Sequence, residues 1–325
     1  PGWDVTLSAP KSVSIMAEVA GDRRLIAAHS AAVKTALVHV EQHMSATRVR
    51  DGGAVNREAT GNLVIASFQH GTSRAQDPQL HTHNVVLNAT KGEDGTWRSL
   101  EPRAIYQLQK QIGAIYRQEL ALKVRELGYE IETGKGSMFE IKGVSGDVLA
   151  AFSTRSAEIE AALGTRGTTR DEASAAEKQV AALDTRQAKV AADPAALVAD
   201  WRETATAAGF GAEARLAMVK EAEAVAISPD HRANMELQGD SAACRAVAHA
   251  ADKLGERQSV FSVAALHEEA GRVGLGKVSY AQISDAIAAA AKQGQLIDRT
   301  HIDRRGAEFA GFTTRFNVET ETKML

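Results

Sequence analysis

The sequence has little of several features that mark particular classes of protein. It contains one cysteine, Cys244, which excludes an internal disulfide and favours a reducing compartment. No apolar run reaches the length of about 18 residues that a membrane-spanning helix needs, and no signal peptide is recognisable. Aromatic residues make up only 5% of the chain, whereas alanine is abundant, which favours helices. We therefore expect a cytoplasmic protein that does not insert into a membrane.

The charge of the chain gives no general argument for a nucleic-acid partner. The formal net charge is −3, so the protein as a whole does not attract a polyanion. Basic residues slightly outnumber acidic ones within residues 1–144, and acidic residues outnumber basic ones in the remainder. Any nucleic-acid site must therefore be a local basic groove.

The most informative stretch runs from His70 to His83, where three of the ten histidines lie within fourteen residues. Short, β-prone apolar runs flank it at residues 63–68 and 84–88, and a polar loop separates them. We predict two neighbouring antiparallel strands with His70 directly opposite His81, their Cβ atoms roughly 5 Å apart. His83 lies two residues beyond His81, so all three side chains are expected on one face of the sheet.

Three neutral imidazoles on one face are a sufficient set of ligands for a divalent metal ion with open positions. The alternative is a structural role, in which His70 caps a strand and His81 and His83 are half-exposed sheet residues. The matching register of three histidines favours the metal. Imidazole-only ligation suits Mn²⁺, Ni²⁺, Cu²⁺ or Zn²⁺ better than Mg²⁺.

Three segments of the chain resemble conjugative relaxases of the MobF type, which belong to the HUH endonuclease superfamily. The run from His70 to His83 looks like the three-histidine motif of these enzymes. The segment Trp3–Ser14 resembles a second block of the family, and Ala182–Arg186 resembles a third. The similarity covers most of the chain, so we expect a relaxase domain that nicks plasmid DNA at an origin of transfer.

The resemblance implies a metal-dependent nicking and strand-transfer reaction, in which a tyrosine attacks a DNA phosphodiester and stays bound to the 5′ phosphate. It assigns His70, His81 and His83 to the metal, with Mg²⁺ or Mn²⁺ as the usual ion and Zn²⁺ or Ni²⁺ as alternatives. Asp4 matches the family's aspartate, which hydrogen-bonds one of these histidines and is a candidate proton acceptor. Considered without the family, Asp4 is a solvated carboxylate on an edge strand.

Four side chains are candidate DNA contacts. Gln109 and Arg117 lie in a segment that resembles the family's base-reading helix, and a spacing of eight residues places them near one helix face. The alternative for both is a solvated helix face. Arg74 lies in the loop between the histidine strands, where a guanidinium suits a metal-bound phosphate. Lys11, just after the first strand, is a weaker candidate for phosphate binding.

The nucleophile implied by the resemblance is not among the four tyrosines of the chain, Tyr106, Tyr116, Tyr129 and Tyr280. The family places its catalytic tyrosines near the mature N-terminus, so we expect them upstream of this sequence. Residues 312–321 resemble the entry into a helicase domain, although no Walker-type phosphate loop is present. We expect a fragment that lacks the N-terminal tyrosines and the C-terminal helicase and that is inactive alone.

The pattern of predicted elements indicates an α+β fold. Residues 1–144 form a two-layer palm of about five or six mostly antiparallel strands, with helices on one face, including a long helix over residues 102–127. Residues 145–255 are predicted to be a helical, fingers-like region, with residues 168–198 as a candidate mobile arm. Residues 256–325 show a winged-helix-like pattern of helices and two wing strands. A small helical cap without DNA contact explains that pattern equally well.

Two other functions share the main features. A rolling-circle replication initiator also uses a three-histidine site, and a non-cleaving module would bind metal and single-stranded DNA at an origin hairpin. The long helical region and the helicase-like entry favour the relaxase. Its partners would be single-stranded DNA at the origin of transfer, relaxosome accessory proteins and a coupling protein. The His-Glu-x-x-His spacing of metalloproteases is missing, which disfavours an unrelated metal hydrolase.

Overall fold

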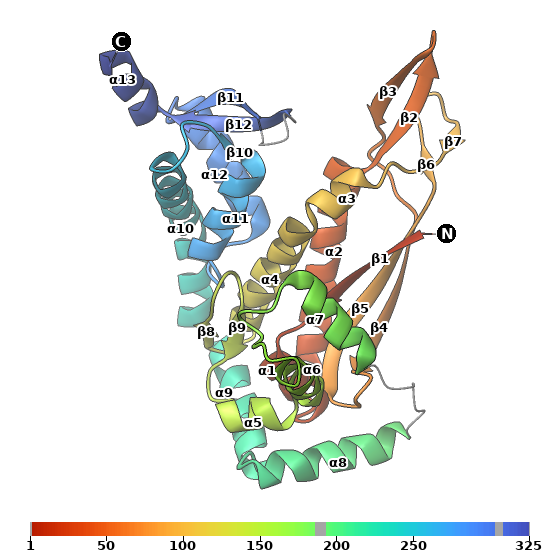
Figure 1. Cartoon of the computed structure of the whole chain (residues 1–325). Coiled ribbons are helices and arrows are strands. Elements are labelled where there is room, and N and C mark those ends of the chain that lie inside the picture. Colours follow the sequence, from red (N-terminus) through yellow and green to blue (C-terminus); the bar gives the residue numbers. More distant parts are fainter. Residues whose placement is uncertain (1, 186–192, 303–307, 325) are drawn as a thin grey trace.

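The histidine motif lies in a three-stranded antiparallel sheet with the strand order β1-β5-β4. The computed structural model describes residues 2–185, 193–302 and 308–324. The central strand β5 (Pro78–Leu87) lies between β1 (Gly2–Ser8) and β4 (Ile65–Thr72) (Figure 1). Every second residue of β5 from Pro78 to Val86 is buried, and the residues between them, His81 and His83 included, are partly exposed on the other face.

Two helices cover the buried side of this sheet. Helix α1 (Lys11–Glu18) is buried from Ser12 to Ala17 and packs on β5. Helix α2 (Arg24–Met44) buries one apolar face, which includes Leu25, Ala28, Ala32, Val33, Ala36 and Val40. Asp22 accepts hydrogen bonds from the backbone and the guanidinium of Arg24, and the helix begins at Arg24 without a side-chain cap.

The long helix expected over residues 102–127 is two helices. Helix α3 (Arg103–Gln107) ends and α4 (Gln109–Glu126) begins at Leu108, whose φ of −105° and ψ of 15° leave the helical region. Ile105 before the break and Ile112 after it are both buried, so the apolar periodicity runs through the bend and conceals it. The break makes Gln109 the first residue of α4.

The remaining strands of residues 2–144, here called the palm, confirm the α+β class and the antiparallel pairing. They do not extend the three-stranded sheet, as a palm of five or six strands would require. They form three separate hairpins: β2 (Ala46–Asp51) with β3 (Ala54–Ala59), β6 (Thr90–Lys91) with β7 (Trp97–Arg98), and β8 (Ile131–Thr133) with β9 (Phe139–Ile141). The strand β3 is almost entirely exposed, so neither of its faces packs on the core that the three-stranded sheet covers.

Residues 145–255 are mainly helical, as expected. The helices are α5 (Gly146–Ala151), α6 (Thr154–Gly164), α7 (Ala175–Asp184), α8 (Pro194–Ala207), α9 (Ala212–Ile227) and α10 (Pro229–Gly255). Ser174 and Glu177 form a capping box at the start of α7, which gives order to part of the segment expected to be a mobile arm. Residues 186–192 of that arm, including the last residue of the third family-like block, lie outside the described residues.

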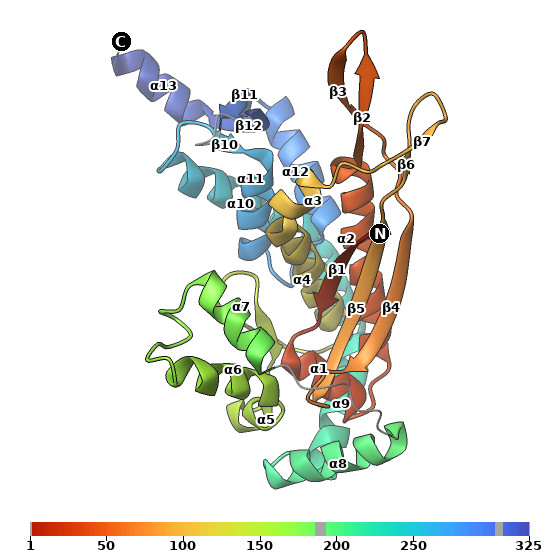
Figure 2. The same cartoon turned by 45° about the vertical axis from the view of Figure 1, so that its right-hand side comes forward.

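Residues 256–324, here called the C-terminal module, contain the expected helices and wing strands. Its elements are β10 (Phe261–Ser262), α11 (Val263–Val273), α12 (Tyr280–Lys292), β11 (Leu296–Ile302), β12 (Glu308–Thr314) and α13 (Arg315–Met324). Helices α10, α11 and α12 and the β10-β12-β11 sheet enclose a second apolar core. Helix α11 packs on α4, so α2 and α4 lie between this module and the histidine-bearing sheet (Figure 2). None of the helices in the described ranges has the length and apolar character needed to cross a membrane.

Candidate metal centre and adjoining cleft

The three histidines of the motif meet on the partly exposed face of the sheet. His70 is paired directly with His81 across β4 and β5, as predicted, and His83 lies opposite Thr6 of β1. The centroid of the His70 ring lies 5.4 Å from the centroid of the His81 ring and 5.7 Å from that of the His83 ring. The centroids of the His81 and His83 rings are 5.1 Å apart. The predicted convergence of the three rings is confirmed.

Two of the three rings are held through their Nδ1 atoms. His83 Nδ1 lies 2.6 Å from Asp4 Oδ2 and 3.0 Å from Thr6 Oγ1, and His81 Nδ1 lies 2.8 Å from the carbonyl oxygen of Gln79. Carboxylate and carbonyl oxygens accept hydrogen bonds, so both Nδ1 atoms carry a proton and donate it. In the neutral imidazole each Nε2 then keeps a lone pair for a ligand.

The chemistry of this donor set fits a divalent metal. Burial lowers the pKa of His81, which favours the neutral imidazole that binds metal ions. Among the described residues, no three or more histidine, cysteine, aspartate or glutamate side chains are arranged as they stand to hold a metal ion. The three rings therefore converge on one face without yet forming a complete metal-binding geometry.

A buried hydrogen-bond network supports β5 from behind. Thr82, between the two motif histidines, points to the opposite face and contacts His29 Nε2 through its hydroxyl at 2.7 Å. His29 Nδ1 contacts the hydroxyl of Tyr116 on α4, also at 2.7 Å. Burial lowers the pKa of His29 to about 4, so the ring is neutral and can donate from one nitrogen and accept at the other. The network ties α2 and α4 to the strand that carries the histidines.

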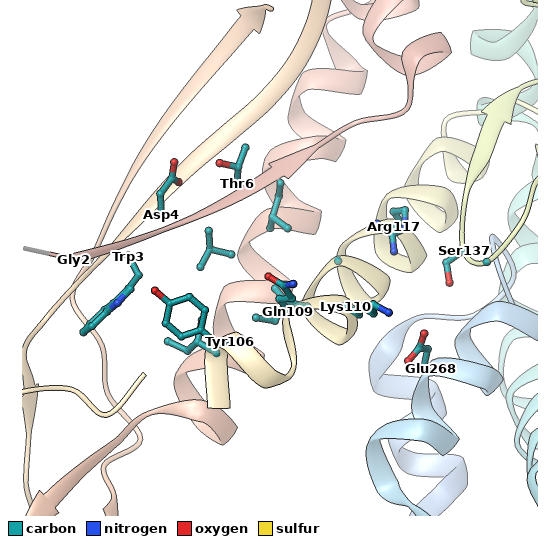
Figure 3. Close-up of a pocket in the computed structure, with 16 residues that line it drawn as sticks. Gly2, Trp3, Asp4, Thr6, Tyr106, Gln109, Lys110, Arg117, Ser137 and Glu268 are labelled. Carbon is teal, nitrogen blue, oxygen red and sulfur yellow. The ribbon is translucent and has the colours of Figure 1, made fainter. Parts of the chain in front are cut away.

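An open cleft of about 670 Å³ adjoins this centre. It lies between β1, the α3–α4 bend and α11, and Asp4 and Thr6 belong to both the cleft and the surroundings of His83. Figure 3 shows Trp3 and Tyr106 toward one end and Ser137 and Glu268 toward the other. The cleft combines aromatic, amide and charged side chains, namely Trp3, Asp4, Thr6, Tyr106, Gln109, Lys110, Arg117, Ser137 and Glu268.

Both residues expected to read bases line this cleft. Gln109 is exposed at the start of α4, and Arg117 lies two turns further on (Figure 3). Within the described chain, Arg117 Nε is buried without a hydrogen-bond partner. Burial lowers the pKa of Arg117, and the charge of Glu268 on α11 opposes that effect. The eight-residue spacing of Gln109 and Arg117 predicted that they lie near one helix face. It did not predict that the same cleft is lined by Glu268, Trp3, Tyr106, Lys110 and Ser137.

The other two candidate DNA contacts lie elsewhere. Arg74 is exposed in the turn between β4 and β5, beyond the paired residues His70 and His81. Lys11 is partly buried, and its Nζ donates a hydrogen bond to the carbonyl oxygen of Pro78 at 3.1 Å. Burial lowers the pKa of Lys11, while the charge of Asp77 opposes that effect. The structure therefore gives the ammonium a local role in holding the turn.

Three of the four tyrosines are engaged inside the protein. The hydroxyl of Tyr116 contacts His29, the hydroxyl of Tyr129 donates to Asp22 at 2.7 Å, and the hydroxyl of Tyr280 lies 3.0 Å from His39 Nδ1. Tyr106, in contrast, is 60% exposed and lines the cleft. Tyr116 is fully buried and belongs to the hydrophobic core.

Comparison with known proteins identifies the family. The family model described as TrwC relaxase matches residues 1–208 of this chain. The chain belongs to the TrwC relaxase family. The resemblance of its motifs to MobF-type conjugative relaxases is thereby confirmed.

Two proteins that the chain is similar to in sequence are much longer than it is. The "Multifunctional conjugation protein TraI" of Escherichia coli strain K12 is 44% identical over 220 residues, which cover 65% of this chain and 12% of that protein. A second Escherichia coli protein of the same name is 40% identical over 279 residues, covering 81% of this chain and 15% of that protein. The chain thus spans less than a sixth of either relative.

The fold agrees with a solved structure of the same family. The conjugative relaxase TrwC in complex with oriT DNA, in its metal-bound form, is 41% identical and superposes with a TM-score of 0.61. The match covers 63% of this chain and 70% of that chain. Both sequence and architecture therefore support the TrwC relaxase assignment.

Proposed function

We propose that this chain carries the metal-binding and DNA-binding parts of a relaxase that nicks one strand of plasmid DNA at an origin of transfer. The observation that carries the proposal is the shared position of Asp4. Its side chain accepts the hydrogen bond that orients His83, and Asp4 belongs to strand β1, which borders the cleft that contains Gln109 and Arg117. A metal-binding face and a DNA-binding cleft therefore meet at one residue.

His70, His81 and His83 would hold the divalent ion. When bound, such an ion polarises a scissile phosphate and offsets negative charge that develops during strand cleavage. Mg²⁺ and Mn²⁺ are the ions that we propose, with Zn²⁺ and Ni²⁺ as alternatives. The hydrogen bonds to Asp4 and to the Gln79 carbonyl oxygen fix two rings with Nε2 available to the ion.

Asp4 is proposed as the residue that positions His83 and as a nearby proton acceptor. Its carboxylate is partly exposed, with 46% of the side chain accessible, so it can face substrate as well as the histidine. Thr6 makes the second contact to the same nitrogen, which limits rotation of the ring. The two oxygens can take different roles, since Oδ2 accepts from His83 while Oδ1 accepts no hydrogen bond from the residues that the structure describes.

Single-stranded DNA is the proposed substrate of the cleft. Gln109 and Arg117 offer amide and guanidinium groups that match the edges of bases, and Trp3 and Tyr106 offer rings on which bases stack. Arg74 is proposed as a phosphate contact at the turn beside the histidines. Lys11 is a weaker proposal for a phosphate contact, because its ammonium already donates to Pro78.

The nucleophilic tyrosine is proposed to come from outside these residues. Tyr116, Tyr129 and Tyr280 have buried or bonded hydroxyls, and Tyr106 is assigned here to base stacking. In this form the chain would bind the origin strand without cutting it, which is the non-cleaving function considered above. The TrwC family match argues against a rolling-circle initiator. A covalent protein–DNA adduct formed by this chain through Tyr106 would overturn this part of the proposal.

The biological setting follows as a further part of the proposal. A relaxase acts on plasmid DNA in the cytoplasm, together with relaxosome accessory proteins and a coupling protein that receives the cut strand. We propose three regions, a palm over residues 1–144, a fingers-like region over residues 145–255 and a winged-helix-like segment over residues 256–325. The third region is proposed to lead into a helicase domain.

The experiment that tests the function measures sequence-selective binding. Oligonucleotides carrying an origin-of-transfer hairpin and nick site are compared with scrambled sequences by fluorescence anisotropy in the presence of Mn²⁺. Arg117→Ala is expected to weaken binding to the origin sequence by about 1–3 kcal/mol and to change binding to the scrambled one much less. Arg315→Ala, on the exposed helix α13, serves as the control. Equal affinity of the native chain for both sequences would refute the proposed function.

A further inference from the structure

A second and larger pocket lies on the side of α4 that faces the C-terminal module. Its volume is about 1,030 Å³, and residues of α2, α4, α11 and α12 line it. It is separate from the DNA cleft, with which it shares no lining residue. Apolar side chains such as Val38, Leu108 and Val263 make up much of its wall. We call it the histidine pocket, after His39, His43 and His267 in its lining.

Two buried polar atoms in this pocket lack a partner. Gln111 on α4 is 7% exposed and His267 on α11 is 9% exposed. Within the part of the chain that the structure describes, Gln111 Oε1 and His267 Nδ1 form no hydrogen bond. Leaving such a group unsatisfied costs about 1–3 kcal/mol. Both atoms are shielded from solvent, so a ligand that recovers this free energy must turn the two side chains toward the pocket.

The same wall carries stacked aromatic rings. The rings of His267 and Tyr280 are stacked, with centroids 4.8 Å apart and an angle of 26° between their planes. His39 meets the edge of Tyr280, and its Nδ1 lies 3.0 Å from the Tyr280 hydroxyl. Burial lowers the pKa of both His39 and His267 to about 4, so both rings are neutral at physiological pH. The wall therefore offers uncharged planar surfaces and uncharged hydrogen-bonding groups.

We propose that the histidine pocket binds a nucleobase, either of a free nucleotide or of a DNA strand. A base is flat and apolar on its faces, which matches the stacked rings and the aliphatic wall. Its edge presents donors and acceptors side by side. In adenine, the exocyclic amine can donate to Gln111 Oε1, and a ring nitrogen can accept from the Nδ1–H of the neutral His267 ring.

The charged residues of the pocket agree with this ligand. Glu119 Oε1 accepts a hydrogen bond from the backbone nitrogen of Tyr280 and so is already engaged. Lys34 is exposed in the lining, where its ammonium can meet a phosphate attached to the base. The remaining acid, Asp285, lies on α12 among the lining residues. The lining therefore carries one lysine and two carboxylates, so the pocket suits the uncharged base, and Lys34 is placed to meet a phosphate attached to it.

The test uses deoxyadenosine monophosphate and a short oligodeoxyadenylate as probes of the full chain. Binding is measured by calorimetry for the native chain and for Gln111→Leu and His267→Leu. Each variant is expected to bind about tenfold more weakly, since it loses one buried hydrogen bond. His249→Leu, at an exposed position of α10 outside the pocket, is the matched control and should bind as the native chain does.

The two sources of the base give different results. If the pocket holds a free nucleotide, the variants weaken binding of the monophosphate and leave binding of the oligonucleotide unchanged. If it holds a base of a strand, they weaken the oligonucleotide, whereas an abasic strand of equal length binds the native chain and the variants alike. Unchanged affinity of both probes in both variants overturns the proposal.

A second measurement guards against loss of folding in the variants. In the native chain, proton resonances of the His267 and Tyr280 rings are expected to shift as the adenine probe is added. Without nucleotide, both leucine variants should melt at or above the native temperature, because the atom that lacked a partner is gone. A lower melting temperature with unshifted ring resonances would assign these residues a purely structural role and refute the nucleobase site.

Discussion

At the scale of single residues, orientation of the imidazoles is the property that the site depends on. His83 is held by Asp4 and Thr6 together, whereas His81 relies on a backbone carbonyl that no substitution removes. Replacement of Asp4 should therefore affect mainly the ring of His83, which would rotate and exchange tautomers more freely.

Replacing Asp4 tests this dependence. Asp4→Ala is expected to weaken Mn²⁺ binding by about 10–100-fold, the usual effect of removing a carboxylate that supports a metal-binding histidine. Calorimetric titration measures the affinity. Asp94→Ala removes an exposed carboxylate that pairs with Arg98 beyond the histidine face, and it should leave the affinity unchanged. If both substitutions have the same effect, Asp4 acts only through its charge and does not position the ring.

The sequence predicted some residues of the site and missed others for a physical reason. His70, His81 and His83 were found because the register of neighbouring strands is a local property of spacing and alternation. Asp4 was found through the family motif. Glu268 reaches the cleft only because α11 packs on α4, a contact between distant segments that no local pattern encodes.

At the scale of elements, the support of β5 by two helices is the decisive feature. The strand is held from behind through Thr82, His29 and Tyr116, which join it to α2 and α4. A loosened network would let the histidine strand shift against β1 and β4. The stability of the packing around β5 therefore determines how well the three histidines keep their relative positions.

Tyr116→Phe probes this network with little change in shape. The substitution leaves His29 Nδ1 without a partner, so we expect the free energy of unfolding to fall by about 1–2 kcal/mol. Urea denaturation followed by circular dichroism measures it. Tyr106→Phe removes a hydroxyl from a ring that is 60% exposed and should change stability by less than about 0.5 kcal/mol. A loss no larger than that of the control would mean that the hydroxyl contributes nothing.

Elements were predicted more reliably than their ends or their assembly. Apolar periodicity predicted the helical course of residues 102–127, because burial of one helix face produces that periodicity. It missed the break at Leu108, since the apolar stripe continues across it. Strand patterns predicted about five or six mostly antiparallel strands, but they contained no information on whether those strands merge into one sheet. The proposed boundaries at 144 and 255 stay predictions.

At the scale of the whole molecule, buried neutral histidines join the palm and the C-terminal module. His29 lies in the palm, while His39 of α2 and His267 of α11 both contact Tyr280 at the junction. Burial lowers the pKa of all three to about 4. Each is therefore less easily protonated in the folded protein than in the unfolded chain.

This difference predicts a loss of stability in mild acid. Above about pH 6.5 both states are neutral at these histidines, and no effect is expected. As the pH falls toward 4, only the unfolded chain takes up protons, so stability declines by up to about 3 kcal/mol per histidine. Below that the folded protein is protonated as well, and the loss levels off. Urea denaturation between pH 7.5 and 5 measures the slope before most carboxylates titrate. His267→Gln should reduce the slope, and an unchanged slope would contradict this account.

The central claim concerns the whole arrangement, in which three histidines from two strands hold one divalent ion beside a DNA cleft. The most direct test is calorimetric titration of the native chain and of His81→Ala with Mn²⁺. We expect one ion per native chain and a loss of most binding in the variant, while the exposed His249→Ala behaves as the native chain does. Unchanged stoichiometry and affinity in His81→Ala would contradict the claim.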